Sequence, residues 1–514
     1  MDGIRDISIS SNSSNSSNPP STTAAQNNRL PSEMLVAIFA HLSRQELSLP
    51  GCKGSCFVRD LVSVTHVCRF WRQAAINAPE LWTEIVTRDI TVEAIKGFLE
   101  RSGELPLNVD LRWVPGGAAE TDQYITDALV PHTHRFRQLS ACVRGSIPFT
   151  KPAPLLERLA IRHSLGDQEI LFDDQAPRLR ELVLVSKGLW LQNQLGNLTT
   201  LHLTLSNDRR THSEFLPFFD MLRRCPVLEE MFLSWSGRDV RLVPPQLPTV
   251  PLHHLRKLVL SSLRVENLKY FLRIFDLKAH GIVIHLSGVN TPLKDNSIPS
   301  IQAMFPNNHS GRPSLLSSTR LGLIFRTQLR LIIIHVVGPG FSIRVDLSPD
   351  ASIPLDKVRC VLHDAFPSVR ELWVRGSSRM DTKLYGIEHF TALERLVLIG
   401  RGSKWARNLR QVFSPDPSGV LPCPLLSTID CYCSAAEMRE VFHLVRTRSS
   451  AGRRLQKLGV PISFIPLPVD VSSCVKDVGG LDTSMNTLRV YSMGLPEFYF
   501  VDHEWWQPWK SGFN

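Results

Sequence analysis

Apolar residues near the start of the chain recur at helical spacing. Leu35, Ile38, Phe39 and Leu42 fall three and four residues apart, which predicts one apolar helix face. Pro31 suits the first turn of that helix, because its fixed φ and missing N–H cost nothing there. A second helix is predicted after Asp60 as its N-cap. Its apolar positions are Leu61, Val64, Val67, Cys68, Trp71 and Ala75. Pro79–Trp82 predicts a closing turn.

The next stretch mixes both periodicities. Val92–Arg101 and Thr121–Leu129 are predicted to be helices, and the alternation of Leu107, Val109 and Leu111 predicts a half-buried strand.

A six-residue pattern, L-x-x-L-x-L with apolar substitutes, then recurs along the chain. It begins at Leu156, Leu179, Leu198, Leu228, Leu255, Val369 and Leu393, with a weaker member at Leu426. Its last two apolar residues alternate as on a strand that faces a core, and the first one fills the turn before the strand. Helices are predicted between these strands at Ser213–Arg224, Glu266–Leu277 and Ala435–Arg446. The pattern is that of an α/β leucine-rich repeat, although the spacing is irregular and the Asn that usually follows the strand is missing.

Two stretches depart from the pattern. Residues 288–328 are rich in Pro, Asn and Ser, which predicts a long loop, followed by strands Leu329–Val337 and Phe341–Leu347 around Gly338–Gly340. The chain ends in aromatic residues, among them Phe498, Tyr499, Phe500, Trp505, Trp506 and Trp509. Two interpretations stay open for them: a cap over the last repeat, or anchors of a recognition surface.

Composition limits the class of protein. At 514 residues the chain exceeds one ordinary domain, and its first 28 residues, rich in Ser and Asn, predict a disordered tail. No apolar run approaches the roughly 18 residues of a membrane-spanning helix. We expect an intracellular protein, cytoplasmic, nuclear or both, that does not bind membranes.

No set of side chains indicates catalysis, a cofactor or a metal. The ten cysteines do not supply four zinc ligands at suitable spacing, and His132 and His134 lack a third ligand. The net charge of +10 allows an acidic partner, but no Lys/Arg run exceeds two and no nucleic-acid motif is present. We therefore expect a protein that is not an enzyme, and nucleic-acid binding remains the less favoured alternative.

Three blocks within residues 29–90 resemble an F-box: L-P-x-E-x-L-x-x-I-F-x-x-L from Leu30, S-V-x-x-V-C-R-x-W from Ser63, and P-x-L-W from Pro79. They are most similar to the F-boxes of mushroom-forming fungi. Ser43–Arg59 is longer than the usual turn between the first two helices and is interpreted as a looped insertion. The resemblance implies binding to the Skp-type adaptor of a cullin-RING (SCF) ubiquitin ligase. The implied contact or support residues are Leu30, Pro31, Leu35, Ile38, Leu61, Val64, Val67, Cys68 and Trp71.

The predicted organisation has four parts: a tail at 1–28, the F-box at 29–90, an α/β leucine-rich-repeat solenoid at 91–460, and a C-terminal cap at 461–514. The predicted function is that of a substrate receptor for ubiquitin-dependent degradation. It would bind the adaptor, and through it a cullin, while the repeats hold a protein substrate whose identity the sequence does not give. The alternative is a protein-interaction scaffold without ligase function.

Overall fold

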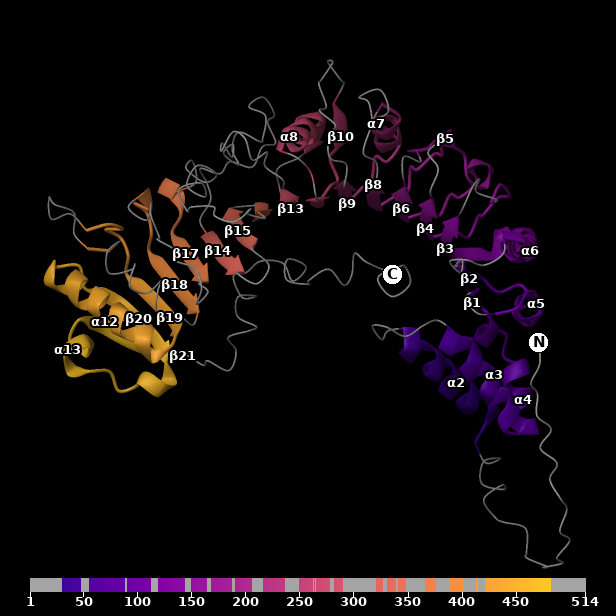
Figure 1. Ribbon diagram of the computed structural model, residues 1–514, viewed down its shortest axis with the longest axis horizontal. Helices are drawn as coiled ribbons and strands as arrows, with labels where there is room; N and C mark the ends of the chain where they lie inside the picture. The colour runs from indigo at the N-terminus through magenta and orange to yellow at the C-terminus, as the bar shows by residue number, and fades with distance from the viewer. Residues whose placement is uncertain are drawn as a thin grey trace, which may run out of the picture. The chain divides into compact units, whose positions relative to one another are not determined.

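The chain divides into two compact units between Leu105 and Pro106 (Figure 1). The structure is a computed structural model. It describes residues 30–47, 55–87, 90–111, 119–143, 149–163, 168–186, 190–205, 216–235, 249–261, 263, 265–277, 282–289, 320–326, 331–338, 341–347, 366–375, 389–400, 413–414 and 421–481. The predicted N-terminal tail and the C-terminal aromatic residues from Phe498 onward lie outside these ranges. Each unit is described by itself.

The first unit is mostly helical. Its elements are α2 (Ser32–Leu47), α3 (Ser55–Val67), α4 (Arg69–Ile76), the 3-10 turn η2 (Pro79–Trp82), β1 (Glu84–Val86) and α5 (Val92–Arg101). Helices α2, α3 and α4 contact one another, and their shared core contains Leu35, Phe39, Leu61 and Ala75. Burying such side chains contributes about 1.5–3 kcal/mol each for the larger ones, which holds the three short helices together.

The second predicted helix is wrong in two respects. Helix α3 already begins at Ser55, so Asp60 lies inside it and is not its N-cap. Much of the Ser43–Arg59 insertion is helical as well, because α2 continues to Leu47; residues 48–54 lie outside the described ranges. The helix also does not run through to Ala75: Cys68 is extended, with φ −159° and ψ 170°, and α4 starts after it.

Helix α5 extends the first unit beyond residue 90, where the sequence placed the end of the F-box region. The buried Trp82 ring meets Phe98 edge to face, with ring centroids 5.0 Å apart. The Arg101 guanidinium lies 4.5 Å from the Trp82 ring centroid, a cation–π contact. Trp82 Nε1 donates to the carbonyl of Ala75 at 2.8 Å. One tryptophan thus ties α5 to α4, and the compact unit reaches Leu105.

The second unit is built on one long sheet whose strands follow chain order through most of its length (Figure 1). Parallel neighbours run in the order β2 (Leu107–Leu111), β3 (Phe136–Val143), β4 (Arg158–His163), β6 (Glu181–Ser186), β8 (Thr200–Leu205), β9 (Glu230–Trp235), β11 (Lys257–Ser261) and β13 (Ile282–Val289). A second parallel run is β17 (Glu371–Arg375), β18 (Arg395–Gly400), β19 (Thr428–Cys433), β20 (Leu455–Pro461) and β21 (Val475–Leu481).

The six-residue pattern coincides with these strands and sets their register. The central position of each strand pairs with the central position of the next strand. This series is Leu159, Leu182, Leu201, Met231 and Leu258, and all five side chains are buried. In the second run Leu372 pairs with Leu396, and Leu396 pairs with Ile429 on its other side; all three are buried. Neighbouring strands therefore bury the same pattern positions in one continuous core. Two members were missed: the strand at Leu455, which fits the pattern, and the one at Phe136, which fits it less well.

The junction between the two runs contains the predicted hairpin of the strands on either side of Gly338–Gly340; residues 339 and 340 lie outside the described ranges. Strand β15 (Leu331–Gly338) is antiparallel to β16 (Phe341–Leu347) and to β14 (Arg320–Arg326). Strand β16 pairs with β13 and β14 pairs with β17, both in parallel, so the chain crosses this part of the sheet in reverse order. The predicted loop at 288–328 is wrong at both ends, which are strands; residues 290–319 lie outside the described ranges.

Helices lie between several strands: α6 (Ala119–Leu129), α7 (Leu216–Arg223), α8 (Val265–Ile274), α12 (Ala435–Ser450) and the short α13 (Val469–Ser472). Helix α8 stops three residues before the predicted end, because Phe275–Leu277 forms strand β12, which pairs with β10 (Val250–Leu252). The smallest sheet joins β5 (Gln168–Glu169) to β7 (Trp190–Leu191). Within the described ranges, the helices are all too short or too polar to cross a membrane.

Candidate partner-binding surface

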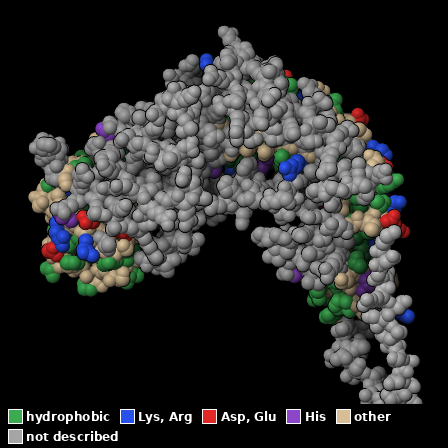
Figure 2. Space-filling view, viewed as in Figure 1, with side chains coloured by type: hydrophobic (Ala, Val, Ile, Leu, Met, Phe, Trp, Pro, Cys, Tyr) green, Lys and Arg blue, Asp and Glu red, His purple; other side chains and the backbone are tan. Residues whose placement is uncertain are grey.

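One face of α2 presents apolar side chains to solvent. Leu30, Met34 and Ile38 are spaced four residues apart, and 41%, 53% and 41% of their surfaces are exposed. Met34 and Ile38 lie above one another on α2, because residues four apart share a helix face, and Leu30 lies just before the first turn of the helix. The three residues are called the α2 stripe from here on. The space-filling view shows hydrophobic side chains gathered on the first unit (Figure 2).

The start of α2 fixes the stripe in place. The backbone N–H groups of Met34 and Leu35 donate to the carbonyl of Pro31 at 3.1 and 3.2 Å, which closes the first turn. Glu33 places a carboxylate at the positive end of the helix dipole. The neighbouring face of α2 buries Leu35 and Phe39. Helix α2 therefore has two apolar faces, and only one of them is used by the core of the unit.

The nine predicted contact residues fall into three groups. Leu30, Pro31, Ile38 and Val67 are exposed; Leu35, Leu61 and Val64 are buried; Cys68 and Trp71 are partly exposed. The exposed group is available to a partner, whereas the buried group packs the unit itself. The structure therefore separates residues that the sequence had grouped together.

Cys68 and Trp71 have local roles at the start of α4. The Sγ of Cys68 accepts the backbone N–H of Trp71 at 3.4 Å, so Cys68 is the N-cap of the helix. The Trp71 ring packs on Phe39 with centroids 5.2 Å apart, which joins α4 to α2. Cys68 and Trp71 thus help to fix the position of α4 against α2.

Sequence reasoning missed Met34, the most exposed member of the α2 stripe, and Val62, which is 39% exposed. The spacing of Leu30, Met34 and Ile38 was a usable signal. It was overlooked because Leu35, Ile38, Phe39 and Leu42 were interpreted as a single face. Ile38 lies on the exposed side, away from the buried Leu35 and Phe39.

A second candidate surface is the sheet face of the second unit opposite the leucine core. Polar positions of the six-residue pattern meet there across neighbouring strands and pair opposite charges. On this face Lys257 pairs with Glu230 at 3.6 Å and Arg395 with Glu371 at 3.0 Å. Two further pairs lie where the chain enters the strands: Arg137 with Glu157 at 3.0 Å and Arg370 with Glu394 at 3.6 Å. Ion pairs between neighbouring strands stabilise the observed pairing of these strands.

The middle of this face is partly desolvated. The His202 ring lies 4.1 Å from the Phe232 ring, centroid to centroid, and Lys257 Nζ lies 4.9 Å from the same Phe232 centroid. Burial, with the nearby charge of Lys257, lowers the pKa of His202 to about 4. Burial also lowers the pKa of Lys257, against the opposing effect of Glu230. The face thus carries a neutral histidine at physiological pH.

Two of the described thiols are buried in surroundings that disfavour their ionised form. Burial raises the pKa of Cys225 to about 12, and its Sγ donates to the carbonyl of Met221 at 3.3 Å. A hydrogen bond with Cys431, together with burial, raises the pKa of Cys433. Both thiols stay protonated, which disfavours metal ligation and nucleophilic attack. Within the described ranges, no three potential metal ligands come together.

Comparison with known proteins bears on the first unit. Residues 27–88 match the model of the F-box-like family, which covers α2, α3, α4 and η2. The search of curated proteins finds no match for the chain. The chain thus carries an F-box-like domain, and F-box domains generally bind Skp-type adaptors of SCF ubiquitin ligases. The α2 stripe lies in this domain.

Proposed function

We propose that this protein is a substrate-receptor subunit of an SCF-type cullin-RING ubiquitin ligase. Its F-box-like domain binds the Skp-type adaptor, and through the adaptor a cullin. The observation that carries the proposal is the α2 stripe: three large apolar side chains exposed on the matched domain, two of them one turn apart on α2 and the third just before the helix. Exposed apolar surface of this kind, on a small domain, is typical of a protein interface.

The exposed apolar side chains can contribute to the stability of a contact. Fully burying a large apolar side chain contributes about 1.5–3 kcal/mol, so the stripe with Val67 could supply several kcal/mol before the costs of association. Pro31 adds a rigid exposed edge at the start of the helix. Leu35, Leu61 and Val64 support this face from within, and Cys68 and Trp71 fix the angle of α4 behind it.

We assign the second unit as an irregular leucine-rich-repeat solenoid that holds a protein substrate. The support is the in-register stacking of the six-residue pattern along the parallel strands, which creates a broad sheet face with side chains of both charges. Long repeat arrays commonly bind proteins in this way. Recruitment raises the effective concentration of substrate lysines near the ubiquitin-charged enzyme. The chain itself has no catalytic step in this proposal, and it acts inside the cell.

The adaptor-binding face can be tested by substitution. In Met34→Asp/Ile38→Asp, two charges replace the centre of the α2 stripe; both positions are more than two-fifths exposed, so the domain should stay folded. We expect the affinity for the purified adaptor to fall at least about a hundredfold, since several kcal/mol of apolar contact would be lost. Binding is measured by calorimetry, with the circular dichroism melt of each variant as the folding check.

The matched control is Ile170→Asp, an apolar residue of the second unit that is 53% exposed. It should leave adaptor affinity unchanged. Full adaptor binding by the double variant would overturn the interface. A second variant lacks residues 30–82. If the intact protein binds the adaptor but the level of its co-purifying proteins does not change in this deletion variant, the protein is a scaffold that does not direct degradation.

A further inference from the structure

The core of the second unit is open at its last described strand. Across the final three strands, the same core position is occupied by Ile429, Leu458 and Val478; the first two are fully buried, whereas Val478 is half-buried. At the next core position, Val460 is fully buried and its partner Gly480 on β21 is exposed. In the described part of the chain, β21 pairs with β20 alone. Its other edge and the flank of the core below it therefore lack a cover there.

Large apolar side chains surround this open end. Ile462, Ile465 and Val469 are 62%, 45% and 84% exposed, and they are called the end patch from here on. A Cβ added to Gly480 would meet Ile462 at 3.2 Å and Ile465 at 3.3 Å, which places both side chains directly beside β21. The end patch and the open core thus form one apolar surface.

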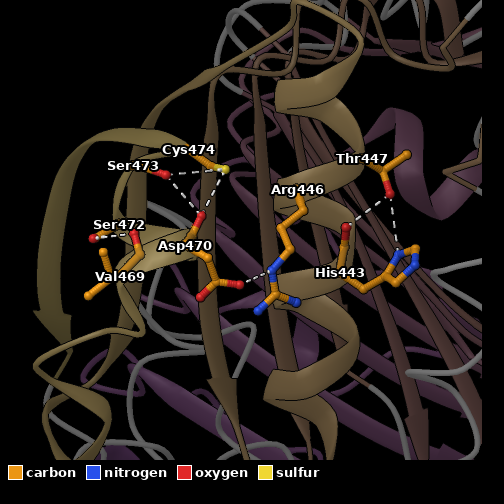
Figure 3. A network of polar contacts seen from close by, with 8 residues as sticks. All are labelled: His443, Arg446, Thr447, Val469, Asp470, Ser472, Ser473 and Cys474. Carbon is orange, nitrogen blue, oxygen red and sulfur yellow. Dashed lines mark hydrogen bonds and ion pairs between the residues drawn. The ribbon is translucent and has the colours of Figure 1, made fainter.

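Hydrogen bonds hold the backbone next to Val469, the most exposed member of the end patch. Asp470, next to Val469, accepts from Arg446 Nε of α12 at 2.6 Å, and Cys474 Sγ donates to the Asp470 carbonyl at 3.1 Å (Figure 3). In the close-up, the Val469 side chain lies on the side away from Arg446 (Figure 3). Val469 is therefore presented outward by a fixed backbone, which favours a defined contact over a mobile surface.

The chain itself supplies a segment of matching chemistry. Residues 482–514 follow β21 directly and include Phe498, Phe500, Trp505, Trp506 and Trp509. This segment has four Asp or Glu and two Lys or Arg, a formal charge of −2. Residues 435–481, which form the end of the unit, have four Asp or Glu and seven Lys or Arg, a charge of +3. Charge and hydrophobicity are thus complementary, and the short connection gives the segment a high effective concentration at the end patch.

We propose that residues 482–514 cover the open end of the sheet, with aromatic side chains against the end patch and β21. The segment then acts as an intramolecular cap, and the exposed edge of β21 is withheld from other chains. This inference is independent of adaptor binding, because it concerns only the second unit.

The test substitutes Val469→Asp in the full chain. An Asp is tolerated in the first turn of α13, so the helix itself does not penalise the change. If the cap covers Val469, a buried charge results, and the urea midpoint of the second unit should fall. Without a cover, an Asp at an 84% exposed site leaves the midpoint unchanged. The control Ile170→Asp should change it little.

A second measurement keeps the test informative. In Trp505→Ser/Trp506→Ser/Trp509→Ser, amide hydrogen exchange of Val475–Leu481 should rise about tenfold or more, while that of Thr200–Leu205 stays the same. Val469→Asp should then add little further loss of stability to this triple variant, since the two changes remove the same contact. Unchanged exchange and an unchanged midpoint would overturn the proposal. A dimer in sedimentation that Val469→Asp dissociates would overturn it too, by assigning the end patch to a second copy.

Discussion

Arg395 of β18 donates from both Nε and Nη2 to one oxygen, Oδ2, of Asp430 on the neighbouring strand, at 2.9 and 2.6 Å. The Asp430 side chain is only 5% exposed, so among the described contacts Arg395 is the main group that balances its buried negative charge. Arg395 Nη1 also donates to Glu371 Oε1 at 3.0 Å, and Trp373 Nε1 donates to the same oxygen at 2.7 Å. One guanidinium therefore links three consecutive strands.

Arg395→Ala should lower the free energy of unfolding by about 2 kcal/mol. Removing one partner of a fully buried pair costs about 3–5 kcal/mol, and the 44% exposure of Arg395 reduces this loss. Urea unfolding of the second unit measures it. The control is Arg137→Ala, whose pair with Glu157 is 53% and 37% exposed and should contribute less than about 1 kcal/mol. Equal losses of unfolding free energy in Arg395→Ala and Arg137→Ala would show that the burial of Asp430 does not strengthen its pair with Arg395.

Gly459→Ala should destabilise the same region by about 1–3 kcal/mol. An added Cβ would lie 2.3 Å from Asp430 Oδ1, and that carboxylate is held by Arg395. Asp430→Ala should remove the penalty, so the two changes together should cost less than their sum. Gly196→Ala has no atom within 4 Å of its added Cβ and is the control, with no expected loss. Thermal melts of the three single variants and the double variant measure these differences.

The second unit should lose stability in mild acid through His202. Its pKa is about 4 in the folded protein and about 6.5 when unfolded. The unfolded chain therefore binds the proton first as pH falls, and stability declines from about pH 6.5 down to pH 4. The expected loss between pH 7.5 and 4.5 is about 2–3 kcal/mol. Urea titrations of the natural protein and of His202→Gln at both pH values measure this loss, because all other groups are shared by the two proteins. An identical change of unfolding free energy with pH in both proteins would show that His202 is not its cause.

Trp82→Phe should loosen α5 from the first unit. The change keeps a ring against Phe98 but removes the hydrogen bond to Ala75, and the cation–π contact with Arg101 weakens. We expect a loss of about 1–3 kcal/mol, with faster hydrogen exchange in Val92–Arg101. Thr83→Ala tests a neighbouring but exposed hydrogen bond, to Glu80, and should have a small effect. Unchanged exchange in α5 would show that the helix is held by other contacts.

The periodic parts of the chain could be predicted because their pattern is also their packing. Leu159, Leu182 and Leu201 were placed on strands from spacing alone, and each lies in the predicted core. The boundary of α3 could not be found in this way. Asp60 has the chemistry of an N-cap, but the helix begins five residues earlier, at Ser55.

Exposure within the F-box-like domain was less predictable. Leu35 and Ile38 are three residues apart and both apolar, yet one is buried and the other is 41% exposed. Only the positions of α3 and α4 decide which apolar face of α2 is covered. The break at Cys68 was also hidden, because a cysteine seldom caps a helix and its neighbours continue the apolar spacing.

The reversed strands at the centre of the sheet have a consequence for how the second unit folds. Strand β13 pairs with β16, joining Ile282 to Phe341, and β14 pairs with β17, joining Arg320 to Glu371. Elsewhere each strand can add to its predecessor after a shorter connection. At the junction, growth from either side must first close a long loop, which costs entropy before any contact is gained. The unit therefore has two zones of sequential assembly that meet at one kinetic bottleneck.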